Sequence, residues 1–378
     1  MSAIEQLLAS RDDGPTAGRP RLPSSARLTL ILVLASTAVI LPFSHHDLGP
    51  QRTFIPLVLT VVVVLDLVSV YLLTVRFCDT GDLRILLMAL AYLWSCLMVV
   101  AWAMSFPGVI SDHPPLGTWP SATPWIYLAW HVGFPALMAV AWGIPGRCAK
   151  TVPDGRRRRV ATALIAASIV TALVVIAGIA VGEHVLPVLI VGVDTTRMST
   201  IGGPPSMLIA VASAVIVHVR LRHRSGPERW ASVTVWVCVA DLTLTFWSLH
   251  RYSVGWYAGR TLTVVCSSLV FFAMLGEFTA LQRRLLRARN EAVSAAIMQR
   301  NFAMSASHEL RTPTTSILGY IEEVLDNEKL DEEDREMLDI AHRNTQRLAR
   351  LVDDLLILGE AEMGPAMMHL VSWKVDAL

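Results

Sequence analysis

The sequence of 378 residues has few charged residues for its length. Asp, Glu, Lys and Arg make up 17% of it and hydrophobic residues 53%, whereas soluble chains carry about 25% charged residues. A soluble fold of this size cannot hide so much apolar surface, so lipid must solvate part of the chain. The formal net charge of +1 averages two chemistries, because residues 27–281 are almost entirely apolar and residues 291–363 are rich in Glu, Asp and Arg.

Cysteine is also scarce. The chain has five cysteines, and no two of them have the CxxC spacing. A disulfide framework and a thiolate metal site are therefore not expected. What the sequence has instead is a series of long apolar runs.

These runs have the length of membrane-spanning helices. A helix needs about 20 apolar residues to cross the hydrocarbon core, and the chain has eight runs near that length: 27–43, 54–75, 85–105, 125–143, 160–182, 205–219, 230–249 and 261–281. The run 186–193 is too short to span and predicts a re-entrant or interfacial loop. The sequence therefore predicts an all-α membrane protein that begins with an eight-helix transmembrane bundle.

Basic residues predict the orientation of this bundle. With eight spans both termini lie on one side, and that side holds 20 Lys and Arg residues. The other side holds four, namely Arg52, Arg197, Arg251 and Arg260. Because short cytoplasmic loops carry an excess of Lys and Arg, we expect both termini, including the tail 1–26, in the cytoplasm.

Three polar residues lie inside predicted spans. Asp66 and Asp241 fall near the middle of their spans, and His131 falls in the outer half of another. Such residues are energetically unfavourable in lipid, which makes a ligand- or proton-sensing cluster one interpretation. The other is that each bonds to Ser, Thr or Trp on a neighbouring helix and only holds the bundle together.

Histidines gather near the predicted outer loops. His45, His46, His113, His184 and His250 lie there and could bind zinc or respond to acidity. No metal spacing such as HxxxH occurs within a helix, so no metal site is assigned. The alternative is that they are ordinary polar residues of the interface.

Two stretches resemble the MASE4 type of bacterial membrane-associated sensor domain. The resemblance rests on FIP (54–56), SFPG (105–108) and WIYLAWHVGFP (125–135). It implies a domain at 27–281 in the bacterial cytoplasmic (inner) membrane that senses a stimulus and passes it to a cytoplasmic output.

The polar tail predicts a helical hairpin. Leu310, Thr314, Ile317, Ile321 and Val324 are spaced as a heptad seam. After a polar turn, a second helix begins near Asp331 and has a similar stripe: Leu338, Ala341, Thr345, Leu348, Val352, Leu355 and Gly359. Because one antiparallel hairpin leaves an apolar face bare, we expect a homodimer that forms a four-helix bundle.

The first of these helices contains the most specific motif of the chain, FAMSASHELRTP (302–313). Together with ILGYIEE (317–323) and RNTQRLARLVDDLLILGEAEMG (343–364), it resembles the HisKA dimerisation and phosphoacceptor domain of sensor histidine kinases. A seam Thr at position 314 departs from the family, which usually has Leu there. The resemblance predicts a signalling helix at 282–301, the phosphotransfer hairpin at 302–363 and the start of a linker at 364–378.

The residues of the motif have expected roles. Imidazole is neutral in part near pH 7 and still nucleophilic, so His308 can accept a phosphoryl group, and Glu309 can orient the ring and accept its proton. The resemblance implies that Thr312 positions water for dephosphorylating the partner. Pro313 removes a backbone donor and lets the helix bend. Arg311 either steers phosphate or pairs with a carboxylate, and His342 and His369 have no comparable context.

A working histidine kinase also needs an ATP-binding domain with DxGxG and GxGxG patterns, and neither pattern occurs in this sequence. We therefore expect no cofactor in this chain, no autophosphorylation by it alone, and a truncation before the domain that would bind ATP and Mg²⁺. The resemblance predicts a membrane-bound sensor kinase whose His308 passes phosphate to a response-regulator receiver domain. The alternative is a non-enzymatic receptor, or a partner phosphorylated in trans. Lipid is an expected partner and nucleic acid is not.

Overall fold

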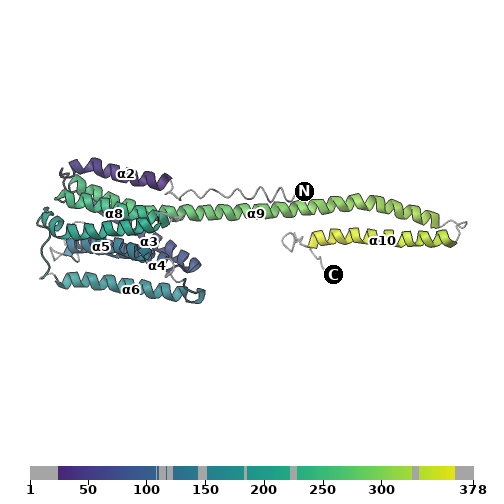
Figure 1. The fold of residues 1–378 in the computed structure, drawn as a ribbon, viewed down its shortest axis with the longest axis horizontal. Helices are drawn as coiled ribbons and strands as arrows, with labels where there is room; N and C mark the ends of the chain where they lie inside the picture. Colours follow the sequence, from purple (N-terminus) through teal and green to yellow (C-terminus); the bar gives the residue numbers. More distant parts are fainter. Residues whose placement is uncertain are drawn as a thin grey trace, which may run out of the picture. The chain divides into compact units, whose positions relative to one another are not determined.

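The computed structural model describes residues 24–107, 109, 116, 122–143, 151–182, 185–221, 228–325 and 332–361. The chain divides into two compact units, Met1–Thr279 and Ala280–Leu378. All regular structure in the described residues is helical, apart from isolated bridges between single residues. Figure 1 shows these helices in chain order.

The first unit contains the apolar helices. Eight helices of the described residues are long and apolar enough to cross a membrane, one for each predicted run. They are α2 (Ser24–Ile40), α3 (Phe54–Thr80), α4 (Leu83–Ser105), α5 (Ala122–Gly143), α6 (Asp154–Val181), α7 (Gly203–Leu221), α8 (Glu228–Ser248) and the first part of α9 (Val254–Leu325). The protein is therefore a multi-pass helical membrane protein.

Several helices extend beyond their apolar runs. Helix α6 begins at Asp154 and includes four arginines before the run that starts at residue 160. Polar residues can continue a helix into the membrane interface, and there hydropathy no longer predicts where the helix ends. Local signals fix other ends: Gly81 closes α3 with a φ of 71°, which glycine adopts without strain, and the Asp82 side chain caps α4.

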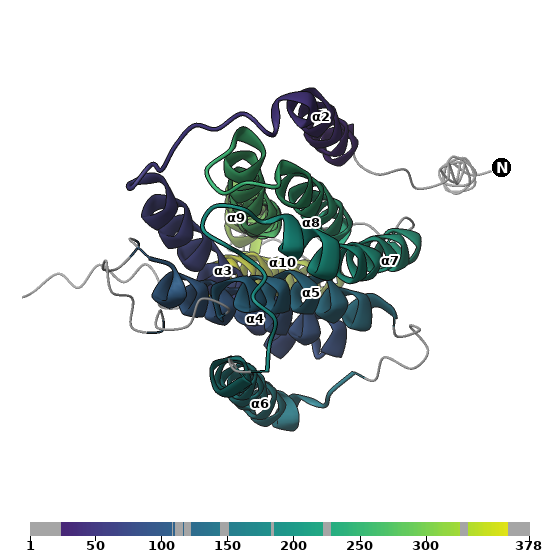
Figure 2. The ribbon, with the colours of Figure 1, turned by 90° about the vertical axis from the view of Figure 1, so that its left-hand side faces the viewer.

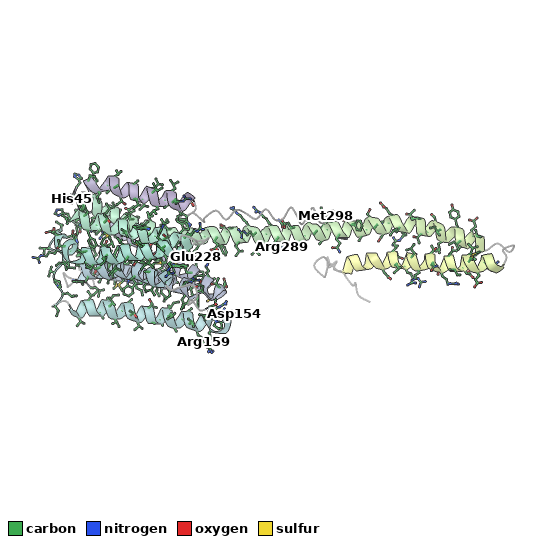
Figure 3. All side chains as sticks on the ribbon, in the orientation of Figure 1. His45, Asp154, Arg159, Glu228, Arg289 and Met298 are labelled. Atoms are coloured by element: carbon green, nitrogen blue, oxygen red, sulfur yellow. The ribbon has the colours of Figure 1, made fainter. Side chains whose placement is uncertain are left out.

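The helices form a bundle around α4. Figure 2 shows α4 and α5 near its middle and α2 and α6 at its edge. Most of α4 is buried, whereas α6 has a largely exposed apolar surface, as expected for a helix that faces lipid. Figure 3 shows Asp154, Arg159 and Glu228 at one end of this unit and His45 at the other.

The run 186–193 is irregular, as expected for a segment too short to span. It leads into single-residue pairings of Asp194 with Val191 and with His250. The neighbouring backbone of Thr195 donates to Leu249 O at 2.9 Å, and that of Arg251 donates to Val193 O at 2.8 Å. These bonds fix the loop against the turn between α8 and α9.

The second unit is a helical hairpin made by the C-terminal part of α9 and by α10 (Glu332–Ala361). Arg311 pairs with Asp353, and Glu322 pairs with His342. Because residues later in α9 meet residues earlier in α10, the two helices are antiparallel, as predicted. Asp331, near which the second helix is predicted to begin, lies outside the described residues.

Candidate functional site

His308 lies on α9 with an exposed side chain. The Thr312 hydroxyl donates to the His308 carbonyl oxygen at 3.3 Å, one helical turn away. His308 and Thr312 therefore share one face of the helix, as their spacing predicts. Glu309 is also exposed, so the three side chains are open to a protein partner.

Pro313 lies inside α9 and does not end it. Proline removes the hydrogen bond to the carbonyl one turn back. Hydroxyls around it bond to other carbonyls of that region: Thr314 donates to Leu310 O at 2.6 Å, Thr315 to Arg311 O at 2.9 Å and Ser316 to Thr312 O at 3.2 Å. Hydroxyl bonds of this kind to the carbonyl one turn back are typical of places where a helix bends.

Arg311 is engaged across the hairpin. Its Nη2 lies 2.5 Å from Asp353 Oδ1 on α10, and both side chains are about half exposed. The pairing with a carboxylate is one of the two interpretations that the sequence left open. His342 Nε2 lies 3.3 Å from Glu322 Oε1, and His369 lies outside the described residues.

Some residues of the two predicted heptad seams are buried between the helices of the hairpin, and others are exposed on its outside. Thr314 and Val352 are buried within the single chain, whereas Leu310, Ile317, Val324 and Leu348 are exposed. The hairpin therefore packs with part of each seam and leaves the other part as an apolar stripe on one protomer.

In the first unit, Asp241 of α8 and His131 of α5 come together. Both are buried, and His131 Nε2 lies 3.2 Å from Asp241 Oδ2. The same carboxylate accepts hydrogen bonds from Thr263 at 2.8 Å and from Thr245 at 3.2 Å. Two of the three predicted intramembrane residues thus form one hydrogen-bonded cluster.

The two ring nitrogens of His131 both face oxygen atoms that can accept. Nδ1 lies 3.0 Å from the carbonyl oxygen of Tyr127, and Nε2 faces Asp241. If Nδ1 donates to the carbonyl, either an imidazolium faces a carboxylate or a neutral imidazole accepts from a carboxylic acid. In either of these forms one hydrogen atom lies between Nε2 and Oδ2, so the two side chains are hydrogen-bonded to each other.

Asp66 is separate from this cluster. Its side chain is fully buried in α3, and among the described residues neither oxygen forms a hydrogen bond of normal geometry. Its polar neighbours are the hydroxyls of Ser95 on α4 and Ser267 on α9. Serine hydroxyls on neighbouring helices are the partners that the helix-holding interpretation of Asp66 requires.

The histidines of the loop end do not gather in the described part of the chain. His45 Nδ1 lies 3.2 Å from Ser248 O, and His46 and His250 are exposed. Within the described ranges no three His, Cys, Asp or Glu side chains group as metal ligands. His113 and His184 lie outside these ranges, so zinc or acidity sensing stays an untested expectation.

Sequence reasoning missed the residues that connect the intramembrane cluster. The Thr245 hydroxyl accepts hydrogen bonds from Tyr127 at 3.2 Å and from Arg260 Nη1 at 2.9 Å and donates to Asp241. The sequence places Arg260 only among the basic residues of the outer side. Its position, after two aromatic residues and before an apolar run, could have indicated that it is buried.

The fold and these sites define a membrane-embedded helical bundle followed by a phosphoacceptor-type hairpin. Residues 51–282 match the model of MASE4, a membrane-associated sensor, integral membrane domain. Residues 298–364 match the His Kinase A (phospho-acceptor) domain. The chain belongs to the MASE4 family of membrane sensors and carries a HisKA domain, which confirms the resemblance.

Curated relatives are sensor proteins and histidine kinases. The sensory/regulatory protein RpfC of Xanthomonas campestris pv. campestris is 31% identical over 169 residues, which are 44% of this chain and 22% of the relative. The sensor protein EvgS of Escherichia coli O157:H7 is 35% identical over 77 residues, which are 20% of this chain and 6% of the relative.

The circadian input-output histidine kinase CikA of Thermosynechococcus vestitus is 34% identical over 96 residues, 25% of this chain and 13% of the relative. The chain thus matches less than a quarter of the length of each of these three relatives. No solved structure matches it.

Proposed function

We propose that this chain is the sensor and phosphoacceptor part of a two-component system. His308 accepts the γ-phosphoryl group of ATP and passes it to an aspartate of a response-regulator receiver domain. The observation that carries the proposal is the exposed His308 of the matched HisKA segment, one turn from Thr312 and next to Glu309.

The chemistry needs an imidazole nitrogen without a proton. That nitrogen attacks the γ-phosphorus, a P–N bond forms, the P–O bond to ADP breaks, and ADP leaves with the bond electrons. Glu309 accepts a hydrogen bond from the other ring nitrogen and then its proton. Thr312 orients the water of the reverse, dephosphorylating reaction, and the turn at Pro313 provides local freedom beside His308. ATP and Mg²⁺ are brought by a kinase ATP-binding domain.

The exposed seam supports a homodimer. Leu310, Ile317, Val324 and Leu348 place an apolar stripe on the outside of one hairpin. A second hairpin that covers this stripe completes a four-helix bundle. The distribution of Lys and Arg supports a bacterial inner-membrane protein with both termini in the cytoplasm.

The same stripe supports a second candidate function. A receptor that dimerises with kinases, or sequesters them, would need the apolar seam and would not need phosphate on His308. Phosphorylation of the chain separates the two functions.

The experiment uses the full chain in maltoside micelles, a separately purified histidine-kinase ATP-binding domain and ATP labelled at the γ-position. We expect label on the wild type that is lost in acid, as phosphohistidine is. His308→Gln should abolish it, whereas His342→Gln, the matched control on α10, should keep it. Label that persists in His308→Gln would contradict the assignment, and a wild type that stays unlabelled would favour the non-enzymatic receptor.

A further inference from the structure

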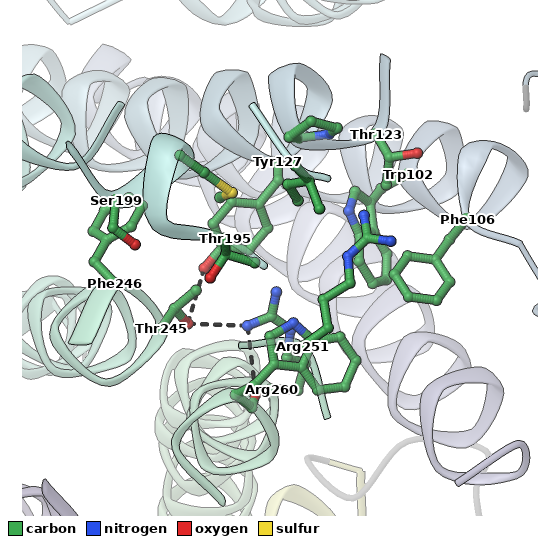
Figure 4. A pocket seen from close by; sticks show the side chains of 14 residues that line it. Trp102, Phe106, Thr123, Tyr127, Thr195, Ser199, Thr245, Phe246, Arg251 and Arg260 are labelled. Carbon is green, nitrogen blue, oxygen red and sulfur yellow. Dashed lines mark hydrogen bonds between the residues drawn. The ribbon is translucent and has the colours of Figure 1, made fainter. Parts of the chain in front are cut away.

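A pocket of the first unit lies where α4, α5, α8, α9 and the loop before α7 meet. Its walls include Trp102, Tyr127, Phe246 and Trp256, and Figure 4 shows the guanidinium groups of Arg251 and Arg260 in the same space. The cavity volume is about 20 Å³, which leaves room for only a few atoms. A small anion fits such a space, whereas a larger organic molecule or a protein segment does not.

Arg260 is a buried cation enclosed by aromatic rings. It is 7% exposed, and its Cζ lies 4.4 Å from the ring centre of Trp256 and 4.8 Å from that of Tyr127. Nη1 donates to Thr245 and to the Trp256 carbonyl. Arg260 reaches Asp241 only through Thr245, and Asp241 already forms three hydrogen bonds. Cation–π contacts alone leave most of such a buried charge uncompensated.

Arg251 adds a second cation at the same place. Its Cζ lies 5.0 Å above the Phe106 ring, and within the described part of the chain neither it nor Arg260 forms an ion pair with a carboxylate. Burial, helped by the charge of Arg260, lowers the pKa of Arg251 to about 10. Two neighbouring cations without a counter-ion favour the binding of an anion.

Two hydroxyl groups of the pocket are also unused. The Thr195 side chain is 5% exposed, and the oxygens of Thr195 and Ser199 are buried without a hydrogen-bond partner in the described residues. Both line the pocket (Figure 4). Buried polar groups are rarely left unpaired, so these two donors point to a ligand with acceptor atoms.

The backbone holds Arg251 in a strained turn. Leu249 and Tyr252, on either side of it, have positive φ angles of 57° and 68°, which bulky residues rarely adopt. The bonds from Thr195 to Leu249 and from Arg251 to Val193 keep this turn in place. A strained backbone of this kind persists only where surrounding contacts hold it in place, and it is frequent at binding sites.

We propose that this pocket binds a small aliphatic carboxylate of about the size of acetate. The carboxylate accepts hydrogen bonds from Arg251, Arg260, Thr195 and Ser199, and its short apolar end packs against the aromatic walls. Guanidinium groups match the planar carboxylate and its two acceptor oxygens. The Thr245 hydroxyl then connects the bound anion, through Arg260, to the hydrogen-bonded pair of Asp241 and His131.

The test is isothermal titration calorimetry of the full chain in maltoside micelles, which contain no phosphate. Sodium acetate is the probe and sodium benzoate is a carboxylate too large for the cavity, with sodium chloride at equal ionic strength as the blank and sodium phosphate as the competing anion class. We expect saturable binding of acetate at one site per chain, with benzoate and phosphate binding more weakly.

Arg251→Gln and Arg260→Gln should each weaken this binding about tenfold or more, because each removes a charge-assisted hydrogen bond. Arg52→Gln, an exposed arginine at the same end of the bundle, should leave it unchanged. Thermal unfolding without ligand shows whether each variant is folded. If Arg260→Gln does not fold, Arg251→Gln still tests the proposal, because Arg251 lies in a turn outside the helices. A folded wild type that does not bind acetate, undiminished acetate binding by a folded Arg251→Gln, or binding of phosphate or benzoate as tight as that of acetate would overturn the proposal.

Discussion

Two buried carboxylates of the same type have opposite surroundings. Asp241 forms hydrogen bonds with His131, Thr245 and Thr263, whereas Asp66 forms none of normal geometry among the described residues and has only the Ser95 and Ser267 hydroxyls near it. A buried carboxyl group with poor hydrogen bonding is less favourable than an apolar side chain of similar shape. We therefore expect Asp66 to lower the stability of the chain and Asp241 to raise it.

Replacing each by valine separates these cases. Asp66→Val removes a poorly hydrogen-bonded buried carboxyl group and should raise the free energy of unfolding by about 1–3 kcal/mol. Asp241→Val leaves His131, Thr245 and Thr263 without their shared partner and should lower it by a similar or larger amount. Thermal unfolding of the full chain in micelles compares the two. A loss of stability in Asp66→Val would show that Asp66 has a partner.

The sequence predicted that Asp66, Asp241 and His131 lie inside spans, because polar residues interrupt an apolar run. It could not predict which of them pair. Pairing depends on which helices are neighbours and how each is rotated, and the heptad and hydropathy patterns of separate spans do not contain that information. For the same reason Thr245, Thr263 and Arg260 were missed as members of the cluster.

At the scale of the element, α8 and α9 approach closely where α9 has glycine. A Cβ at Gly259 would lie 2.6 Å from Thr245 Oγ1 and 2.7 Å from Asp241 Oδ1, whereas a Cβ at Gly276 would meet nothing within 4 Å. The glycine at 259 thus leaves room for the buried hydrogen bonds of Asp241. Helices α8 and α9 can pack this closely only because residue 259 is a glycine and has no Cβ.

Two alanine substitutions in α9 test this difference. Gly259→Ala should destabilise the chain by about 1–3 kcal/mol, because the added methyl displaces the hydrogen-bonded side chains of α8. Gly276→Ala should stabilise it by up to about 1 kcal/mol, the difference in helix propensity. The readout is the midpoint of thermal unfolding. A stable Gly259→Ala variant would contradict the close packing of α8 on α9 at this point.

The hairpin was the element best predicted from sequence. Its motif and the seam spacing agree with the helices that the structure describes, and local patterns of this kind determine a helical hairpin without reference to distant residues. The division of the seam was less accessible: burial of Thr314 and exposure of Leu310 and Ile317 depend on the rotation of α9 against α10.

At the scale of the whole molecule, the exposed seam predicts the oligomeric state. Ile317→Glu places a charge in the apolar stripe and should convert a dimer into a monomer, as measured by multi-angle light scattering of the full chain in micelles. Ser316→Glu, the exposed neighbour outside the seam, should remain dimeric. An Ile317→Glu variant with the mass of a dimer would show that another surface holds the two copies together.

The orientation in the membrane is a second property of the whole molecule. In a background with Cys78 and Cys148 replaced by serine, a cysteine at Val185 should react with an impermeant maleimide on intact cells, and one at Gly155 should not. Both positions are exposed and lie at opposite ends of the bundle. The positive-inside distribution gives the expected result, and labelling at Gly155 alone would reverse the orientation.

The central claim is that His308 carries the phosphoryl group. Tandem mass spectrometry at neutral pH, on the full chain phosphorylated by an added ATP-binding domain, locates the modification directly. We predict phosphate on the peptide that contains His308, with fragment ions that place it on that imidazole and not on Thr312 or Ser307. A phosphate mapped to any other residue, with His308 unmodified, would contradict the account.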